Sequence, residues 1–117
     1  MKKLTLVILM ILSTHVFSGE CINCTIKFMG CSGKYLGKQS CSIYFNESIS
    51  NKASCATGTD SGNRMVLDVS NEGEKGILSL AISAKLANQK VTVYGNNTCD
   101  IWTTHESINL LYIGEVK

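Results

Sequence analysis

The sequence predicts a mainly β domain that contains one helix, and three observations support that prediction. Apolar residues recur with helical spacing over one long stretch only, between Asn71 and Asn88. Short segments that alternate between apolar and polar residues occupy most of the remaining chain, as in half-buried strands. Six cysteines in a short chain without proline suit a small domain held together by disulfides. We therefore expect strands arranged around a single helix.

The helix is expected to begin near Glu72 and to stop at Asn88, a residue type that accepts the left-handed conformation. Asn71 and Glu74 have capping-box spacing, so that Asn71 can accept from the first turn and Glu74 can reach back. Its apolar positions cover more than half of the helical wheel, which predicts burial on more than one side. These positions are Ile77, Leu78, Leu80, Ala81, Ile82, Ala84, Leu86 and Ala87.

Five strands are expected, with apolar residues alternating along each of them. The predicted inward-facing sets include Ile26 with Phe28 in the first strand and Ile108, Leu110 and Tyr112 in the last. The order strand, strand, strand, helix, strand, strand is that of the OB-fold, a five-stranded barrel whose helix plugs one end. Ferredoxin-like and doubly wound sheets need further helices. The five strands are expected at Cys24–Met29, Ser40–Asn46, Arg64–Ser70, Lys90–Tyr94 and Ser107–Ile113.

Residues 1–19 are expected to form a secretory signal peptide. A basic start precedes an apolar run from Leu4 to Leu12, and cleavage is expected after Ser18 or Gly19. The run is too short to span about 30 Å of hydrocarbon, which disfavours a membrane anchor. We therefore expect an exported protein, secreted or periplasmic, with no integral membrane segment in its mature form.

Residues 20–117 are expected to form one disulfide-bonded domain. Removing Lys2 and Lys3 with the leader lowers the 11 basic residues to 9, which equals the 9 acidic residues. A near-neutral protein argues against nucleic-acid binding, because binding phosphate requires a basic face. An even number of cysteines in a short exported chain predicts a disulfide framework with 15 pairings that composition cannot separate. The cysteines are Cys21, Cys24, Cys31, Cys41, Cys55 and Cys99.

A resemblance to a known family appears at the helix. The string LSLAISAKLANQKVTVYG, followed by Cys99, Trp102 and the last strand, resembles small exported bacterial proteins related to the B subunit of subtilase cytotoxin and to pertussis-like toxin B subunits. The resemblance covers about Cys55 to Ile113. The N-terminal cysteine cluster has no match in those subunits, and no sugar-binding residue of theirs can be carried over to this chain.

That resemblance implies several properties of this chain. A disulfide between Cys55 and Cys99 is implied, and in the chain-entropy treatment a loop of about 45 residues closed in this way is worth roughly 3 to 4 kcal/mol. Known family members form ring pentamers, place their helices around a central pore and bind host glycans. By resemblance, we expect a homo-pentamer, a glycan ligand and an exported A subunit as partners. The helix would then contact its neighbours through Ile77, Leu78, Ala81 and Ile82.

Cys21 and Cys24 form a CxxC motif, which invites a redox or a zinc interpretation. Thioredoxin-like chemistry places that motif at a helix N-terminus and uses a nearby cis-proline, whereas this chain has no proline. A zinc site that uses Cys31 and Cys41 as well is disfavoured by uneven spacing and an oxidising compartment. We therefore expect disulfides here, with no metal and no cofactor.

The loop before the last strand holds the candidate ligand-binding residues, Asp100, Trp102 and Glu106. Two carboxylates beside an aromatic ring fit glycosidase chemistry, and they also fit glycan binding, in which the ring stacks on a sugar and the carboxylates accept from its hydroxyls. Trp102 could equally cap the end of the barrel. His105 lacks a recognisable nucleophile motif around any serine, so it is expected to be a surface loop residue.

Three functions follow in order of preference. The first is a non-catalytic glycan-binding subunit that resembles toxin B subunits. The alternative is a periplasmic or secreted domain that binds or inhibits another protein without a toxin partner. The third, an enzyme, is the weakest, because few ionisable groups can converge, and no catalytic residue is assigned.

Overall fold

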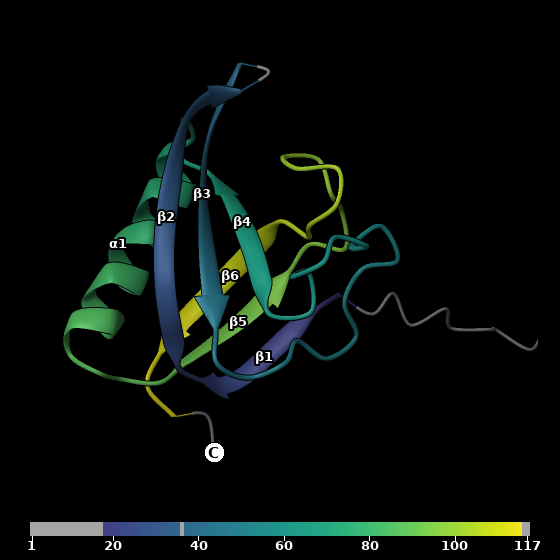
Figure 1. Ribbon diagram of the computed structural model, residues 1–117. Helices are drawn as coiled ribbons and strands as arrows, with labels where there is room; N and C mark the ends of the chain where they lie inside the picture. Colours follow the sequence, from purple (N-terminus) through teal and green to yellow (C-terminus); the bar gives the residue numbers. More distant parts are fainter. Residues whose placement is uncertain (1–17, 36, 116–117) are drawn as a thin grey trace, which may run out of the picture.

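The computed structural model describes residues 18–35 and 37–115 of the chain, so the expected leader lies almost entirely outside the described residues. This part folds into six strands and one helix (Figure 1). It is mainly β with one helix, as the sequence predicts. The elements are β1 (Glu20–Cys24), β2 (Ile26–Tyr35), β3 (Lys38–Phe45), β4 (Arg64–Asp68), α1 (Glu72–Leu86), β5 (Val91–Gly95) and β6 (Ile108–Ile113).

The strands form two three-stranded antiparallel sheets instead of a closed five-stranded barrel. One sheet has the order β1-β5-β6 and the other has the order β2-β3-β4. The expected first strand, Cys24–Met29, corresponds to β2, and β1 was not expected; at Thr25, between β1 and β2, the chain passes directly from one sheet into the other. At the opposite corner, one parallel bridge joins Val66 of β4 to Ser107 before β6.

Two β-bulges explain why the expected alternation fails in β2 and β6. An extra residue, Lys27, separates the pairs of Ile26 and Phe28, so Ile26 is buried while Phe28 is 47% exposed. In the same way, Asn109 interrupts β6 after Ile108. Because a bulge turns the following side chains to the other face, the buried partner of Ile108 is Leu111, and Leu110 and Tyr112 point outward.

The core lies between the two sheets and under α1, which packs against β2, β4 and β6. Asn71 accepts from the Gly73 N–H at 2.9 Å, as expected for the helix N-cap, and Asn88 adopts the left-handed conformation after the helix, with φ 53°. Glu74 does not complete a capping box. It accepts instead from the backbone N–H of Asp68 at 3.1 Å and so ties the helix to the end of β4.

The disulfide framework predicted from the cysteine count is present. Its three bridges join Cys21 with Cys24, Cys31 with Cys41, and Cys55 with Cys99. The third spans 44 residues and joins the β3–β4 loop to the β5–β6 loop. Within the described residues, no helix has both the length and the apolar character needed to cross a membrane.

Candidate functional site

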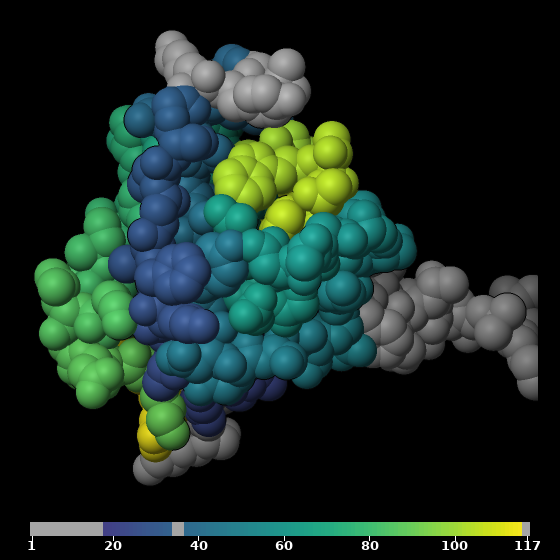
Figure 2. All heavy atoms as spheres, in the orientation of Figure 1, coloured from purple at the N-terminus to yellow at the C-terminus, as the bar shows by residue number. Residues whose placement is uncertain are grey.

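The candidate site lies where two long loops meet the outer face of the β2-β3-β4 sheet. The loops cover residues 46–63 and 96–107, and besides the Cys55–Cys99 disulfide they share a hydrogen bond from the Gly58 N–H to the Thr104 carbonyl at 3.1 Å. In Figure 2 the second loop, in yellow-green, stands beside the blue and teal atoms of the sheet. Residues far apart in the sequence therefore meet on this face.

Strand register builds a stack of rings and one guanidinium on this face. Phe28 pairs with Tyr44 across β2 and β3, and Tyr44 pairs with Arg64 across β3 and β4. The Phe28 and Tyr44 ring centroids lie 4.1 Å apart. The Arg64 guanidinium lies 4.5 Å from the Tyr44 centroid and 4.4 Å from that of Trp102, which comes from the loop. We call Phe28, Tyr44, Arg64 and Trp102 the aromatic–arginine stack.

Asp60 holds this stack from the side through three side-chain hydrogen bonds. Its carboxylate accepts from the Tyr44 hydroxyl, from Arg64 Nη1 at 3.0 Å and from His105 Nε2. Burial alone would raise the pKa of Asp60, but the hydrogen bonds from Tyr44 and His105 and the charge of Arg64 outweigh it and lower the pKa to about 2. Asp60 is thus an anion at neutral pH, and it offsets the charge of Arg64.

The same carboxylate acts on Tyr44. The Asp60 hydrogen bond, with a smaller contribution from burial, raises the pKa of Tyr44 above its usual value. Tyr44 therefore stays a neutral donor at neutral pH. His105 is buried, and its ring meets the Trp102 ring edge-on with the centroids 5.3 Å apart. The expectation that His105 is a surface residue is wrong, because the 46–63 loop covers its ring.

A pocket of about 190 Å³ opens beside the stack. Its lining exposes more apolar than polar surface, and Ser42 Oγ accepts from Arg64 Nη2 at 3.0 Å. Nε of Arg64 is buried and has no hydrogen-bond partner among the described residues. The lining residues are Gly30, Cys31, Ser32, Ser42, Arg64 and Trp102.

The three ligand-binding residues expected from the sequence do not converge. Trp102 lines the 190 Å³ pocket, whereas Asp100 lines a separate pocket of about 510 Å³ near the start of α1. The Asp100 carboxylate accepts from the Ser107 and Thr98 hydroxyls, and the Ser107 bond is the main cause that lowers the pKa of Asp100. Asp100 thus stabilises the loop that carries Trp102.

Glu106 is the least accessible of the three, with 1% of the residue exposed. Its carboxylate accepts from three backbone N–H groups, those of Gly19 at 2.9 Å, Ala53 at 2.6 Å and Asn97 at 3.1 Å. These groups belong to the chain before β1, to the β3–β4 loop and to the β5–β6 loop. Glu106 therefore fixes three separate segments of backbone and does not face either pocket.

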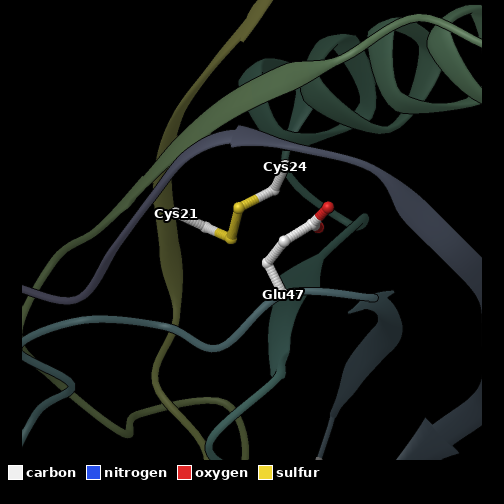
Figure 3. Close-up of side chains that lie close together, drawn as sticks. All are labelled: Cys21, Cys24 and Glu47. Atoms are coloured by element: carbon white, nitrogen blue, oxygen red, sulfur yellow. A yellow bond between two sulfur atoms is a disulfide. The ribbon is translucent and has the colours of Figure 1, made fainter.

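Figure 3 shows the CxxC segment, where the Cys21–Cys24 disulfide lies beside the carboxylate of Glu47. Disulfide sulfurs are not the thiolates that zinc binding or redox attack requires. The Glu47 carboxylate accepts from the Thr25 N–H at 2.8 Å and from its hydroxyl at 3.0 Å. In this oxidised form, the segment bridges the irregular part of β1 instead of offering ligands.

The four helix residues expected at an oligomer interface divide between the core and the surface. Ala81 is fully buried in the core of the domain, and Ile77 and Leu78 pack partly against the same core. Ile82 is exposed, and so is Leu86 one turn later. The part of α1 that is accessible to a partner therefore includes Ile82 and Leu86 but not Ala81.

The site residues that sequence reasoning missed are Phe28, Tyr44, Asp60 and Arg64. Tyr44 and Arg64 alternate with the apolar residues of β3 and β4, which is a signal for an outward-facing side chain, but which residues are cross-strand neighbours depends on register. Asp60 lies in a polar loop, where nothing in the local pattern marks it.

No family model, curated protein or solved structure matches the chain.

Proposed function

We propose that this chain is an exported domain that binds glycans through its aromatic–arginine stack without catalysing a reaction. The observation that carries the proposal is the Arg64 guanidinium held between the Tyr44 and Trp102 rings at the edge of the 190 Å³ pocket. Such a pocket is smaller than the 300 to 1,000 Å³ typical of drug-sized ligands and suits a single sugar ring.

The chemistry of the pocket supports a sugar as its occupant. A ring such as Trp102 can stack on the apolar face of a sugar, and the hydroxyls of Ser32 and Ser42 can exchange hydrogen bonds with the hydroxyls of the ligand. The unpartnered Nε–H of Arg64 is a further donor that a small local shift would present to a bound oxygen. A rigid stack of side chains also loses little conformational entropy on binding.

Binding is preferred to catalysis because the pocket lacks the required acid and base. Glycoside hydrolysis uses two carboxyl groups that flank the scissile bond. The described lining of the pocket contains no carboxylate. The carboxylate that is bonded to Arg64 of the stack, that of Asp60, is already engaged by Tyr44, Arg64 and His105.

The fold and the resemblance extend this proposal. An OB-like arrangement is supported by the bend at Thr25 and by the parallel bridge between Val66 and Ser107, which link the sheets at two corners. A toxin B-subunit role, with host glycans as ligands, a pentamer and an A subunit, is supported by the sequence resemblance alone.

A glycan array probed with the exported, oxidised protein tests the proposal. Trp102→Ala should weaken binding to any glycan detected by about tenfold or more, since a central stacking residue commonly contributes more than 1.4 kcal/mol. Tyr112→Ala is the control, because Tyr112 is an exposed aromatic residue on β6 that does not line the pocket. The proposal is contradicted if the wild-type protein binds no glycan, or if Trp102→Ala binds as well as Tyr112→Ala does.

Protein binding, here to a second copy of the chain, is the second candidate function, and the apolar side of α1 favours it. Leu78, Ile82 and Leu86 recur every four residues along one side of the helix, and Leu86 is 83% exposed. Light scattering on the wild type and on Leu86→Glu tests self-association through this stripe. A mass of several protomers that falls to one in the variant supports an interface between copies, and a monomeric wild type rejects it.

A further inference from the structure

The buried carboxylate of Glu106 lacks a charged partner among the described residues. The ion pairs of this part of the chain involve other residues, and the groups that reach Glu106 are neutral backbone N–H donors. Burying a carboxylate without an opposite charge is costly, even where hydrogen bonds compensate in part. A cation at this position would complete the site.

One of the three donors, Gly19, lies at the expected processing point. Its nitrogen is 2.9 Å from Oε2 and 3.2 Å from Oε1 of Glu106, and its carbonyl accepts from the Gly95 N–H at 2.7 Å. A Cβ on Gly19 would lie 2.6 Å from Oε1 of Glu106. Gly19 is therefore an integral part of the fold, and cleavage after Gly19 would remove these contacts.

Cleavage after Ser18 retains them. It also places Val16 and Ser18 at the two positions where a signal peptidase requires small or aliphatic residues, whereas cleavage after Gly19 would place Phe17 at one of them. The sequence alone left both cleavage points open. The contacts of Gly19 favour the earlier one.

We propose that the leader is removed between Ser18 and Gly19, and that the new α-ammonium of Gly19 becomes the buried counter-ion of Glu106. Water hydrolyses the Ser18–Gly19 peptide bond, leaving a carboxyl group on Ser18 and an amine on Gly19 that takes a proton from solvent. One neutral donor is thereby replaced by a cation with three N–H bonds, next to a carboxylate that already lies within hydrogen-bond distance. Processing thus stabilises the domain in addition to releasing it.

The first test is to identify the N-terminus of the exported protein. The full chain is expressed with its own leader, recovered after export, and analysed by intact mass and N-terminal sequencing. A chain that begins at Gly19 is expected. A chain that begins at Glu20 or later, or one that keeps its leader, overturns the proposal.

The ion pair is tested by a double-mutant cycle on the oxidised protein. Chains that begin at Gly19 are compared with chains that keep Ser18, in which the Gly19 nitrogen is a neutral amide. The chain that begins at Gly19 should unfold at a higher urea concentration, and Glu106→Gln should abolish most of this difference. Equal midpoints, or a difference that survives Glu106→Gln, overturn the ion pair.

A measurement on the wild type keeps the test decisive if Glu106→Gln does not fold. The unprotonated α-amine is the form that reacts with cyanate, and each unit by which an ion pair raises its pKa lowers the reactive fraction about tenfold. Gly19 should react at least about tenfold more slowly in the folded chain than in urea. Equal rates would show that no buried ion pair is present.

Discussion

Asp60 and Glu106 are two carboxylates that each accept hydrogen bonds from three partners, but they organise different regions. Glu106 is almost fully buried, and backbone N–H groups from three distant segments surround it. The Asp60 side chain is 31% exposed, and the side chains of Tyr44, Arg64 and His105 surround it. The Glu106 carboxylate, which is bonded to backbone, holds three segments of the chain next to one another. The Asp60 carboxylate, which is bonded to side chains, fixes the positions of those side chains on the surface.

The largest expected effect comes from removing the buried carboxylate. Glu106→Ala leaves the buried N–H groups of Gly19 and Ala53, and the partly buried one of Asn97, without their partner, and at about 1 to 3 kcal/mol for each buried unsatisfied group the loss should reach about 4 kcal/mol. That is a large part of the 5 to 15 kcal/mol stability of a typical domain. Urea denaturation followed by the fluorescence of Trp102, the single tryptophan, measures it.

Two further variants sharpen that experiment. Gly95→Ala keeps the carboxylate but places a Cβ 1.7 Å from Oε2 of Glu106, so it should be similarly destabilising. Glu72→Ala removes a carboxylate whose side chain is 89% exposed, and it should change stability by less than about 0.5 kcal/mol. If Glu106→Ala costs no more than Glu72→Ala, Glu106 does not hold the three segments together.

The next effect concerns the disulfide that serves both regions. Replacing Cys55 and Cys99 together by serine opens a loop of 44 residues, for which the chain-entropy treatment gives about 4 kcal/mol. Replacing Cys31 and Cys41 opens a loop of 10 residues and should cost about 2.7 kcal/mol. Urea denaturation of both double variants measures the ranking. If the Cys55/Cys99 variant lost less stability than the Cys31/Cys41 variant, the β3–β4 and β5–β6 loops would stay together without the disulfide between them.

Asp60 should produce a smaller effect that depends on pH. Its pKa falls from 3.8 in the unfolded reference to about 2 in the fold, so its contribution is complete above pH 3.8 and is lost as the pH falls towards 2. Between pH 4 and pH 2, the urea midpoint should therefore decrease more steeply for the wild type than for Asp60→Asn. Glu115→Gln, which removes an exposed carboxylate, is the matched control. Parallel pH profiles for the wild type and Asp60→Asn would contradict this role.

The sequence predicted the elements of this fold better than it predicted their pairing. The helical spacing after Asn71 located α1, and alternation located β2 to β6 but not β1, because both signals are local. The bulges at Lys27 and Asn109 were not foreseen, since an extra residue in a strand has no local signature. Each bulge changes which side chains face the core, so the expectation for Phe28 failed with it.

The candidate site was predicted only through Trp102. An aromatic residue in a loop is visible in a sequence, but its stacking on Arg64 depends on two strands and a disulfide-linked loop coming together. Glu106 was selected for its carboxylate, a choice that cannot distinguish a ligand-facing group from one that binds its own backbone. Burial makes that distinction, and burial is a property of the whole fold.

The smallest effect on stability should come from the exposed end of the stack. Phe28 is 47% exposed and contacts Tyr44 on one side, so Phe28→Ala should cost less than about 1 kcal/mol and leave the Glu106 region unchanged. The effect of Phe28→Ala on glycan binding shows whether the ligand contacts the whole stack or only the pocket. If the ligand lies along the whole stack, Phe28→Ala should weaken binding while Tyr112→Ala does not; if the ligand occupies the 190 Å³ pocket alone, Phe28→Ala should bind as the wild type does.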